Sequence, residues 1–184
     1  MLRLPEGVRA RIYEYALGGS TINIDYETYR TIESSSDLTW RTIPVFKYRC
    51  TVYSQRNISP SRSTQLPYVN IKHCFTVLNN ICRQLYIETA TLPYTLNTLA
   101  FSTYNVLFNF LFIEQRLSRE QRDAMTSITV TDALPLPNLL IFMRNLKTVQ
   151  LTDNLPGKEM GTYKVTRVKG KAPKLLNTKH VWGG

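Results

Sequence analysis

The second half of the chain alternates between short strand-type segments and helical segments, and this alternation restricts the possible folds more than any other feature. Residues 97–102, 127–131 and 146–151 have the length and the residue types of strands. Residues 105–117 lie between the first two of these segments and have the composition of a helix. A strand–helix–strand order is typical of crossover units, so the pattern predicts a partly parallel sheet.

Two further strand-type segments lie in the first half, at residues 21–26 and 43–53. The first alternates apolar with polar residues, and the second is rich in β-branched and aromatic residues. We expect them to form an antiparallel pair, with residues 34–37 and 54–67 as loops. The chain has 184 residues, which suits one domain. The predicted fold is therefore α+β, a single domain with a mixed β-sheet of about five strands and three or four helices.

The helical periodicity makes specific predictions about burial. Residues 4–17 form a short amphipathic pattern that ends at Gly18 and Gly19. Residues 75–89 form the clearest helix, and its apolar face is expected to pack on the strand at 97–102. The members of that face are Phe75, Leu78, Cys82 and Leu85.

The helix at residues 105–117 is apolar on nearly every side, which indicates that it is covered on more than one face. We expect the sheet or a second copy of the chain to cover Phe108 and Phe112, so a homodimer is one possible arrangement. Ser118 and Gln121 have the spacing of a capping box and predict a short helix that follows.

Positive charge is concentrated at the C-terminal end of the chain, whose formal net charge is +10. Residues 156–184 contain seven Lys or Arg and one acidic residue. This composition predicts a flexible basic tail that follows a domain at residues 1–155. An alternative interpretation is an arm that binds nucleic acid through phosphate contacts. Its candidate residues are Lys164, Arg167, Lys169, Lys171 and Lys174.

The sequence offers no pattern of catalytic, metal-binding or cofactor-binding residues. The two histidines, His73 and His180, do not pair with a cysteine at a spacing typical of a nucleophile or a zinc site. We therefore expect no enzymatic activity, no metal and no cofactor. An odd number of cysteines without CxxC spacing favours buried free thiols in the cytoplasm or nucleus. No apolar run approaches the roughly 18 residues that cross a bilayer, so we expect no membrane partner.

Two segments together resemble a known group of proteins. The first is residues 4–17 (LPEGVRARIYEYAL), and the second is residues 81–101 (ICRQLYIETATLPYTLNTLAF). They are similar to the filamentous-fungal F-box-like proteins, which open with an LPxExRxxIYxxxL helix and later carry a CRQIxxEAxxLxYxxNTFxF segment. The resemblance extends in order over roughly residues 4 to 150.

This resemblance implies a protein–protein interaction module, either a substrate adaptor of a ubiquitin ligase or a fungal effector that acts inside a host cell. The implied partner is a Skp-type adaptor of a cullin–RING ligase. The residues that match the F-box opening are the expected contacts: Leu4, Pro5, Val8, Ile12 and Leu17. The alternative interpretation of this apolar stripe is that it packs the first helix on the sheet of the same domain.

Overall fold

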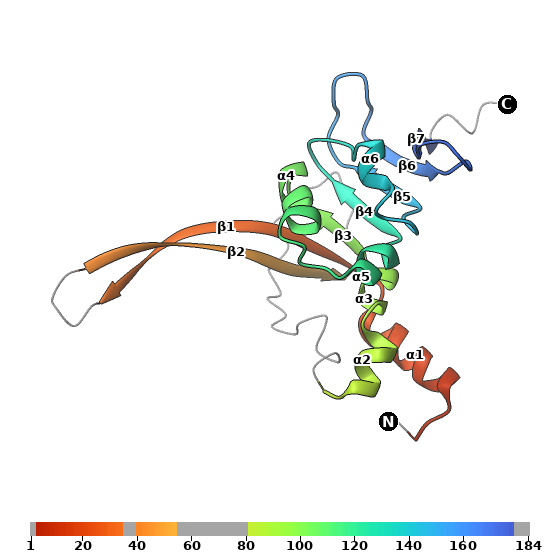
Figure 1. Cartoon of the computed structure of the whole chain (residues 1–184), viewed down its shortest axis with the longest axis horizontal. Coiled ribbons are helices and arrows are strands. Elements are labelled where there is room, and N and C mark those ends of the chain that lie inside the picture. The colour runs from red at the N-terminus through yellow and green to blue at the C-terminus, as the bar shows by residue number, and fades with distance from the viewer. Residues whose placement is uncertain (1–2, 35–39, 55–80, 179–184) are drawn as a thin grey trace.

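The computed structural model describes residues 3–34, 40–54 and 81–178 of the chain. Within these residues seven strands form one sheet in the order β2-β1-β3-β4-β5-β6-β7 (Figure 1). The strands are β1 (Ser20–Ser34), β2 (Trp40–Ser54), β3 (Thr98–Phe101), β4 (Ser127–Val130), β5 (Thr148–Leu151), β6 (Gly161–Thr166) and β7 (Lys174–Asn177). The predicted α+β fold with a mixed sheet is confirmed, and the sheet has two strands more than the sequence indicated.

The pairing of the strands follows the order of the sequence patterns. Strands β1, β3, β4 and β5 are parallel to one another, whereas β2, β6 and β7 pair antiparallel with their neighbours. The antiparallel pair in the first half and the parallel crossovers in the second half are therefore both confirmed. The predicted loops at 34–37 and 54–67 lie almost entirely outside the described residues.

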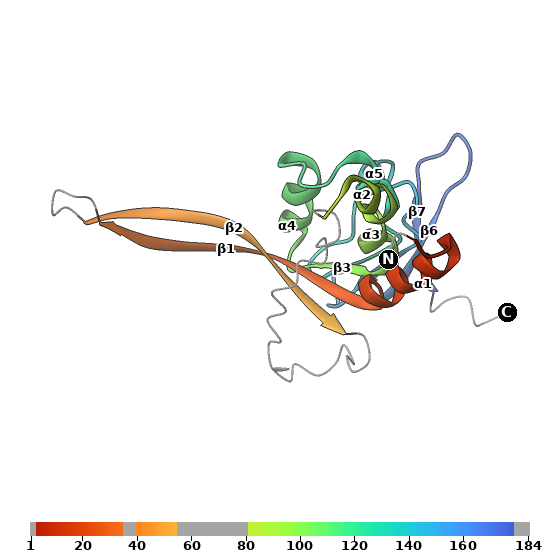
Figure 2. The ribbon, with the colours of Figure 1, turned by 90° about the horizontal axis from the view of Figure 1, so that it is seen from below.

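Strands β1 and β2 continue beyond the sheet as a two-stranded arm (Figures 1 and 2). Only Thr21 to Ile24 of β1 pair with β3, while β1 pairs with β2 along its whole length. The register places each acidic residue of β1 opposite a basic residue of β2. The opposed positions are Asp25 and Arg49, Glu27 and Lys47, and Glu33 and Arg41.

Helices α3, α4 and α5 lie on one face of the sheet (Figure 2). The helices are α1 (Glu6–Leu17), α2 (Arg83–Thr89), α3 (Leu92–Leu96), α4 (Tyr104–Phe108), η3 (Asn109–Ile113), α5 (Arg119–Ala124) and α6 (Pro137–Leu140). Each of β3, β4 and β5 alternates half-buried with buried residues, and the buried ones join the helices in one apolar cluster. Burial of each such side chain stabilises the fold by about 1.5–3 kcal/mol.

The segment predicted as one helix at 105–117 is α4 followed by a π-helical turn, η3. In that turn the Glu114 amide donates to the Asn109 carbonyl over 2.8 Å, a bond to the fifth preceding residue. Phe108 and Phe112 are half-buried against the main core, with their ring centroids 5.8 Å apart. The prediction that these two rings are covered is confirmed, and the core of the same chain contributes the cover. The predicted capping box of Ser118 and Gln121 is present at the start of α5.

The prediction of a flexible tail is wrong for the strands β6 and β7, which complete the sheet. In β6 the buried residues Tyr163 and Val165 alternate with the exposed residues Thr162 and Lys164. This alternation is typical of a half-buried strand. The exposed Lys164 contributes to the positive charge that suggested a tail.

The helix predicted at 75–89 is described only from residue 81 onward, and it begins later than expected there. Helix α2 begins at Arg83, and Cys82 is its exposed N-cap residue, so the expected burial of Cys82 is wrong. Phe75 and Leu78 lie outside the described residues. Leu85 is buried as predicted, but it packs with Tyr13 and Leu17 of α1 and not on the strand at 97–102.

Truncation of Leu85 therefore tests the contact between α1 and α2. Leu85 is 5% exposed, and we expect Leu85→Ala to lower the free energy of unfolding by about 2–5 kcal/mol. Ile87 is exposed on the same short helix, so Ile87→Ala should change it by less than about 0.5 kcal/mol. Chemical denaturation of both variants measures the difference, and equal effects would contradict the assignment of Leu85 to a core.

Candidate interaction site on the first helix

The two segments that carry the family resemblance meet in space, although a long stretch of chain separates them. Arg9 of α1 forms two hydrogen bonds to the Glu88 carboxylate of α2, from Nη2 over 3.0 Å and from Nε over 3.1 Å. The Tyr13 hydroxyl donates to the same carboxylate over 2.8 Å, and the Gln84 amide donates to it over 3.1 Å. Such charge-assisted, two-pronged pairing fixes the orientation of α1 on α2.

These contacts shift the protonation of both partners. The hydrogen bonds from Arg9, Tyr13 and Gln84 hold the pKa of Glu88 below its ordinary value of 4.5, with that from Arg9 contributing most. Burial, together with the hydrogen bond to Glu88, raises the pKa of Tyr13. Glu88 therefore remains an acceptor and Tyr13 remains a donor near neutral pH.

A small apolar cluster lies beside this polar contact. Tyr13, Leu17 and Leu85 are buried together, and Leu92 packs against them. Leu17 was expected to contact a partner protein, but it is 9% exposed and belongs to this cluster. The assignment of Leu17 to the interaction surface is therefore wrong.

The side chain of Asn97 connects the end of α1 to the start of the sheet. Its amide nitrogen donates to the carbonyls of Leu17 over 2.5 Å and of Pro93 over 2.8 Å. Its amide oxygen accepts from the Ser20 N–H over 2.8 Å. Gly19 has a φ of 75°, which glycine adopts without strain, and this turn brings β1 back toward Asn97.

The remaining apolar residues of α1 face away from these contacts. Leu4, just before the helix, and Val8, Ile12 and Tyr15 are all exposed, with Val8 at 46% and Tyr15 at 90%. At about 100° per residue, Val8 lies roughly 140–180° around the helix axis from Tyr13 and Leu17. We call these four residues the apolar stripe. The interpretation that Leu4, Val8 and Ile12 pack on the sheet of the same domain is therefore wrong.

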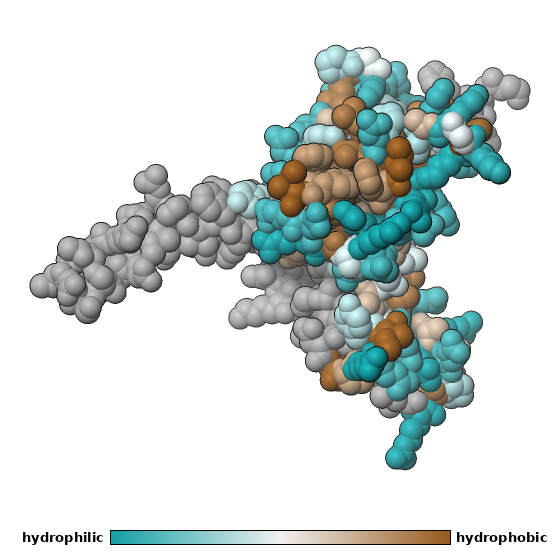
Figure 3. All heavy atoms as spheres, in the orientation of Figure 1, coloured by the Kyte–Doolittle hydropathy of each residue, from teal (hydrophilic) through white to brown (hydrophobic). Residues whose placement is uncertain are grey.

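The helix surface between these residues is open. Gly7 and Ala16 contribute little side chain, and a shallow apolar hollow lies over Val8, Ile12 and Tyr15. Pro5 is exposed next to it. The structure thus leaves four of the five predicted contact residues accessible: Leu4, Pro5, Val8 and Ile12. Other exposed apolar residues are Ile113 on η3 and Leu136, Ile141 and Phe142 next to α6. Apolar residues also gather on the face seen in Figure 3.

The candidate residues for nucleic acid lie on the hairpin of β6 and β7. Lys164, Lys169, Lys171 and Lys174 are exposed there, and we call them the lysine hairpin. Arg167 is different, because its guanidinium donates to the carbonyls of Met143 and Leu146 over 2.6 Å each. Burial also lowers the pKa of Arg167. Arg167 therefore anchors the hairpin to the segment after α6, and its guanidinium is already bound to backbone carbonyls.

The described residues contain no group of three or more His, Cys, Asp or Glu side chains that could hold a metal ion. His73, Cys74 and His180 lie outside this part of the chain. Cys50 and Cys82 form no disulfide and are exposed, so the expected burial is wrong for both.

Comparison with models of known protein families, with curated proteins and with solved structures finds no significant match. Among the helices that the structure describes, none is both long enough and apolar enough to span a bilayer.

Sequence reasoning identified the exposed residues of α1 but missed the residues that hold the helix in place. Arg9 and Glu88 are 79 residues apart, and a single sequence contains no signal that pairs them. Asn97 was interpreted as the first residue of a strand. Its position directly before an apolar strand and after a Pro-containing turn is the local signal of a capping role.

The lowered pKa of Glu88 predicts how stability depends on pH. A carboxyl group whose pKa is lower in the folded than in the unfolded chain stabilises the fold above the unfolded value, and this contribution disappears as the pH falls through the folded pKa. We expect Glu88→Gln to be less stable than the wild type at pH 7 and to lose less stability below about pH 4.5. Urea denaturation across this range measures both effects. Glu14→Gln, which removes an exposed carboxyl group from α1, is the matched control. A wild-type pH slope in Glu88→Gln would contradict the assigned role.

Proposed function

We propose that this protein is a non-enzymatic interaction module that binds a partner protein through the apolar stripe of α1. The observation that carries the proposal is the exposure of the stripe: among the described residues, its side chains lie outside the buried cluster and the ion pair that fix α1 to α2, although the Leu4 carbonyl accepts a hydrogen bond from Arg9. Exposed apolar residues on a helix that is already held by other contacts are typical of a docking surface. A few desolvated apolar anchors supply most of the affinity of such a complex.

The partner that we propose is a Skp-type adaptor of a cullin–RING ubiquitin ligase, as the resemblance to F-box-like proteins implies. The close packing of the two resembling segments supports this proposal, because Arg9, Tyr13 and Glu88 join them into one unit. The protein would then be a substrate adaptor, or a fungal effector that uses the same surface inside a host cell. Both roles place it in the cytoplasm or nucleus.

The test is a titration of the full chain with a Skp-type adaptor, at low and at high salt. We expect binding that changes little with salt and weakens at least about tenfold in Val8→Glu, because an apolar contact is replaced by a desolvated charge. Ile113→Glu places the same charge at another exposed apolar position, on η3, and should bind like the wild type. A circular dichroism spectrum and a melting temperature like those of the wild type show that Val8→Glu is folded.

Absence of adaptor binding, or equal binding by Val8→Glu and the wild type, would contradict the proposed function.

The lysine hairpin favours a second candidate function, the binding of nucleic acid. Its four lysines lie on one hairpin, and residues 160–178 contain no acidic residue. If this function holds, affinity for a generic oligonucleotide should fall steeply with salt, because each phosphate contact releases a counterion. The triple variant Lys169→Glu, Lys171→Glu and Lys174→Glu should abolish binding, whereas Arg167→Gln should mainly lower stability. Oligonucleotide binding that is insensitive to salt would exclude this function.

A further inference from the structure

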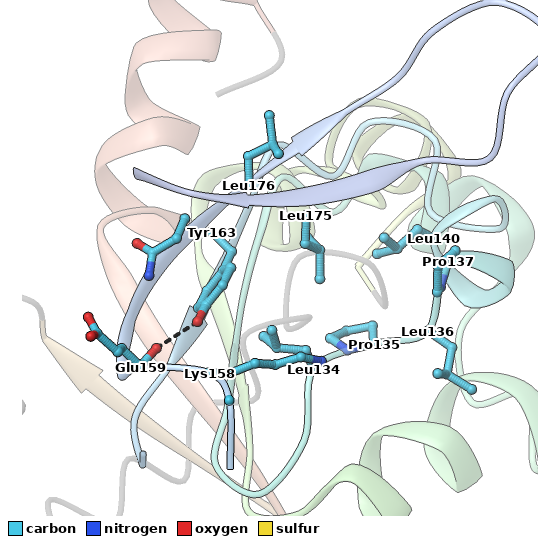
Figure 4. Close-up of a pocket in the computed structure, with 12 residues that line it drawn as sticks. Leu134, Pro135, Leu136, Pro137, Leu140, Lys158, Glu159, Tyr163, Leu175 and Leu176 are labelled. Atoms are coloured by element: carbon cyan, nitrogen blue, oxygen red, sulfur yellow. Dashed lines mark hydrogen bonds between the residues drawn. The ribbon is translucent and has the colours of Figure 1, made fainter. Parts of the chain in front are cut away.

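Strand β7 forms one edge of the sheet and borders an apolar hollow of about 530 Å³ (Figure 4). The hollow lies between the hairpin of β6 and β7 and the segment that joins β4 to α6. Its lining includes Leu134, Pro135, Pro137, Leu140, Tyr163 and Leu175. The Tyr163 hydroxyl donates to the Glu159 carbonyl over 2.7 Å, so this polar group of the lining already has a partner. Lys158, Glu159 and Asn177 also line the hollow, but most of its lining residues are apolar, so its interior favours apolar side chains.

The backbone of β7 also presents hydrogen-bonding groups next to the hollow. The Val165 N–H donates to the Lys147 carbonyl over 2.8 Å, so the polar groups of Val165 face away from β7. Leu175 is opposite Val165 in the register. In an antiparallel pair, two residues that lie opposite each other either both point their N–H and C=O groups at the other strand of the pair or both point them away from it. The N–H and C=O of Leu175 therefore point to the outer edge of β7.

The two faces of β7 differ in chemistry. The side chain of Leu175 points into the hollow, whereas that of Leu176 is on the other face of the strand and lines only the rim of the hollow (Figure 4). Lys174 is on the same face of the strand as Leu176, because side chains alternate along a strand. Lys164 is opposite Leu176 in the neighbouring strand β6. An added strand would thus meet an apolar hollow on one face and two lysines on the other.

From these features we propose that the edge of β7 binds an extended segment of a partner protein in which apolar and acidic residues alternate. The segment would add a strand to the sheet, place its apolar side chains in the hollow beside Leu136 and Leu175, and place its acidic side chains near Lys164 and Lys174. Main-chain bonds at a sheet edge supply affinity in this type of recognition, and pockets for alternate side chains supply specificity.

The charges of the two edge strands favour the binding of an acidic partner segment over pairing with a second copy of the chain. Pairing of β7 with another β7 would bring Lys174 of the two copies close together, and like charges at facing positions are destabilising. The other edge strand, β2, carries Arg41, Lys47 and Arg49 and no acidic residue. Neither edge complements the other in charge, whereas an acidic segment complements β7.

The experiment uses the full chain and fluorescein-labelled eight-residue peptides in which Asp alternates with Leu, Ile, Val, Phe or Met. Fluorescence anisotropy measures the affinity. We expect at least one of these peptides to bind, with an affinity at least tenfold higher than two control peptides. The first control replaces the apolar residues by Ser, and the second has Pro at alternate positions, which removes the N–H groups that pair with β7.

Variants of the protein then test the two faces separately. Leu136 is 59% exposed at the rim of the hollow, and we expect Leu136→Glu to weaken peptide binding at least tenfold. Ile113→Glu is the matched control and should bind like the wild type. Lys174→Glu should weaken binding severalfold at low salt and less at high salt, whereas Lys147→Glu, outside the hairpin, should not. The Leu175 amide should exchange its hydrogen more slowly in the complex.

Three results would overturn the proposal. The first is that no alternating peptide binds. The second is equal binding of the acidic control with Ser, which would show a surface for polyanions in general. The third is binding that is lost in Lys174→Glu but unchanged in Leu136→Glu, which would exclude the hollow.

Discussion

The buried amide of Asn97 is the contact on which the arrangement of the helical end and the sheet depends. It supplies hydrogen bonds to the last carbonyl of α1, to the first amide of β1 and to a carbonyl of α3, directly before β3 begins. A buried backbone group left without a partner costs about 1–3 kcal/mol, and Asn97 provides a partner for three of them. The elements α1, α3, β1 and β3 all meet at this side chain. Its hydrogen bonds therefore fix the position of the first helix relative to the sheet.

Because the position of α1 is fixed, the residues that stabilise the fold can be distinguished from those that are exposed and could contact a partner. In the resembling segments, Tyr13, Leu17 and Leu85 form a core, while Arg9 and Glu88 form an ion pair. These residues therefore hold the two segments together in the fold. Among the described residues, no side chain of the apolar stripe belongs to this core or this ion pair, and for this reason its exposure supports the proposed binding function more directly than the resemblance does.

Local sequence patterns correctly predicted those elements that depend on contacts between neighbouring residues. The capping box of Ser118 and Gln121 and the strand β4 depend on neighbouring residues, and both were predicted correctly. The alternative interpretation, that Val8 and Ile12 pack inward, is wrong, and the sequence did not indicate that Tyr13 is the buried residue of α1. Tyr13 is buried since Glu88, 75 residues away, accepts a hydrogen bond from its hydroxyl. The charge of the C-terminal segment likewise obscured β6, whose one lysine, Lys164, lies on its exposed face. The burial of Tyr13 thus depends on a contact between distant residues, which the local sequence pattern does not contain.

The order of the strands places the two proposed binding surfaces at different ends of the sheet. Helix α1 leads directly into β1, whereas β7 is five strand positions away from β1. Neighbouring strands are about 4.8 Å apart, so roughly 24 Å separate the two strands. In the proposed adaptor role the protein would hold two partners at once, and this separation of the two strands is compatible with that role. The surfaces also differ in chemistry, because the stripe is apolar and uncharged while the edge of β7 combines an apolar hollow with lysines. A partner suited to one surface is therefore poorly suited to the other, which is the condition for a protein that joins two different molecules.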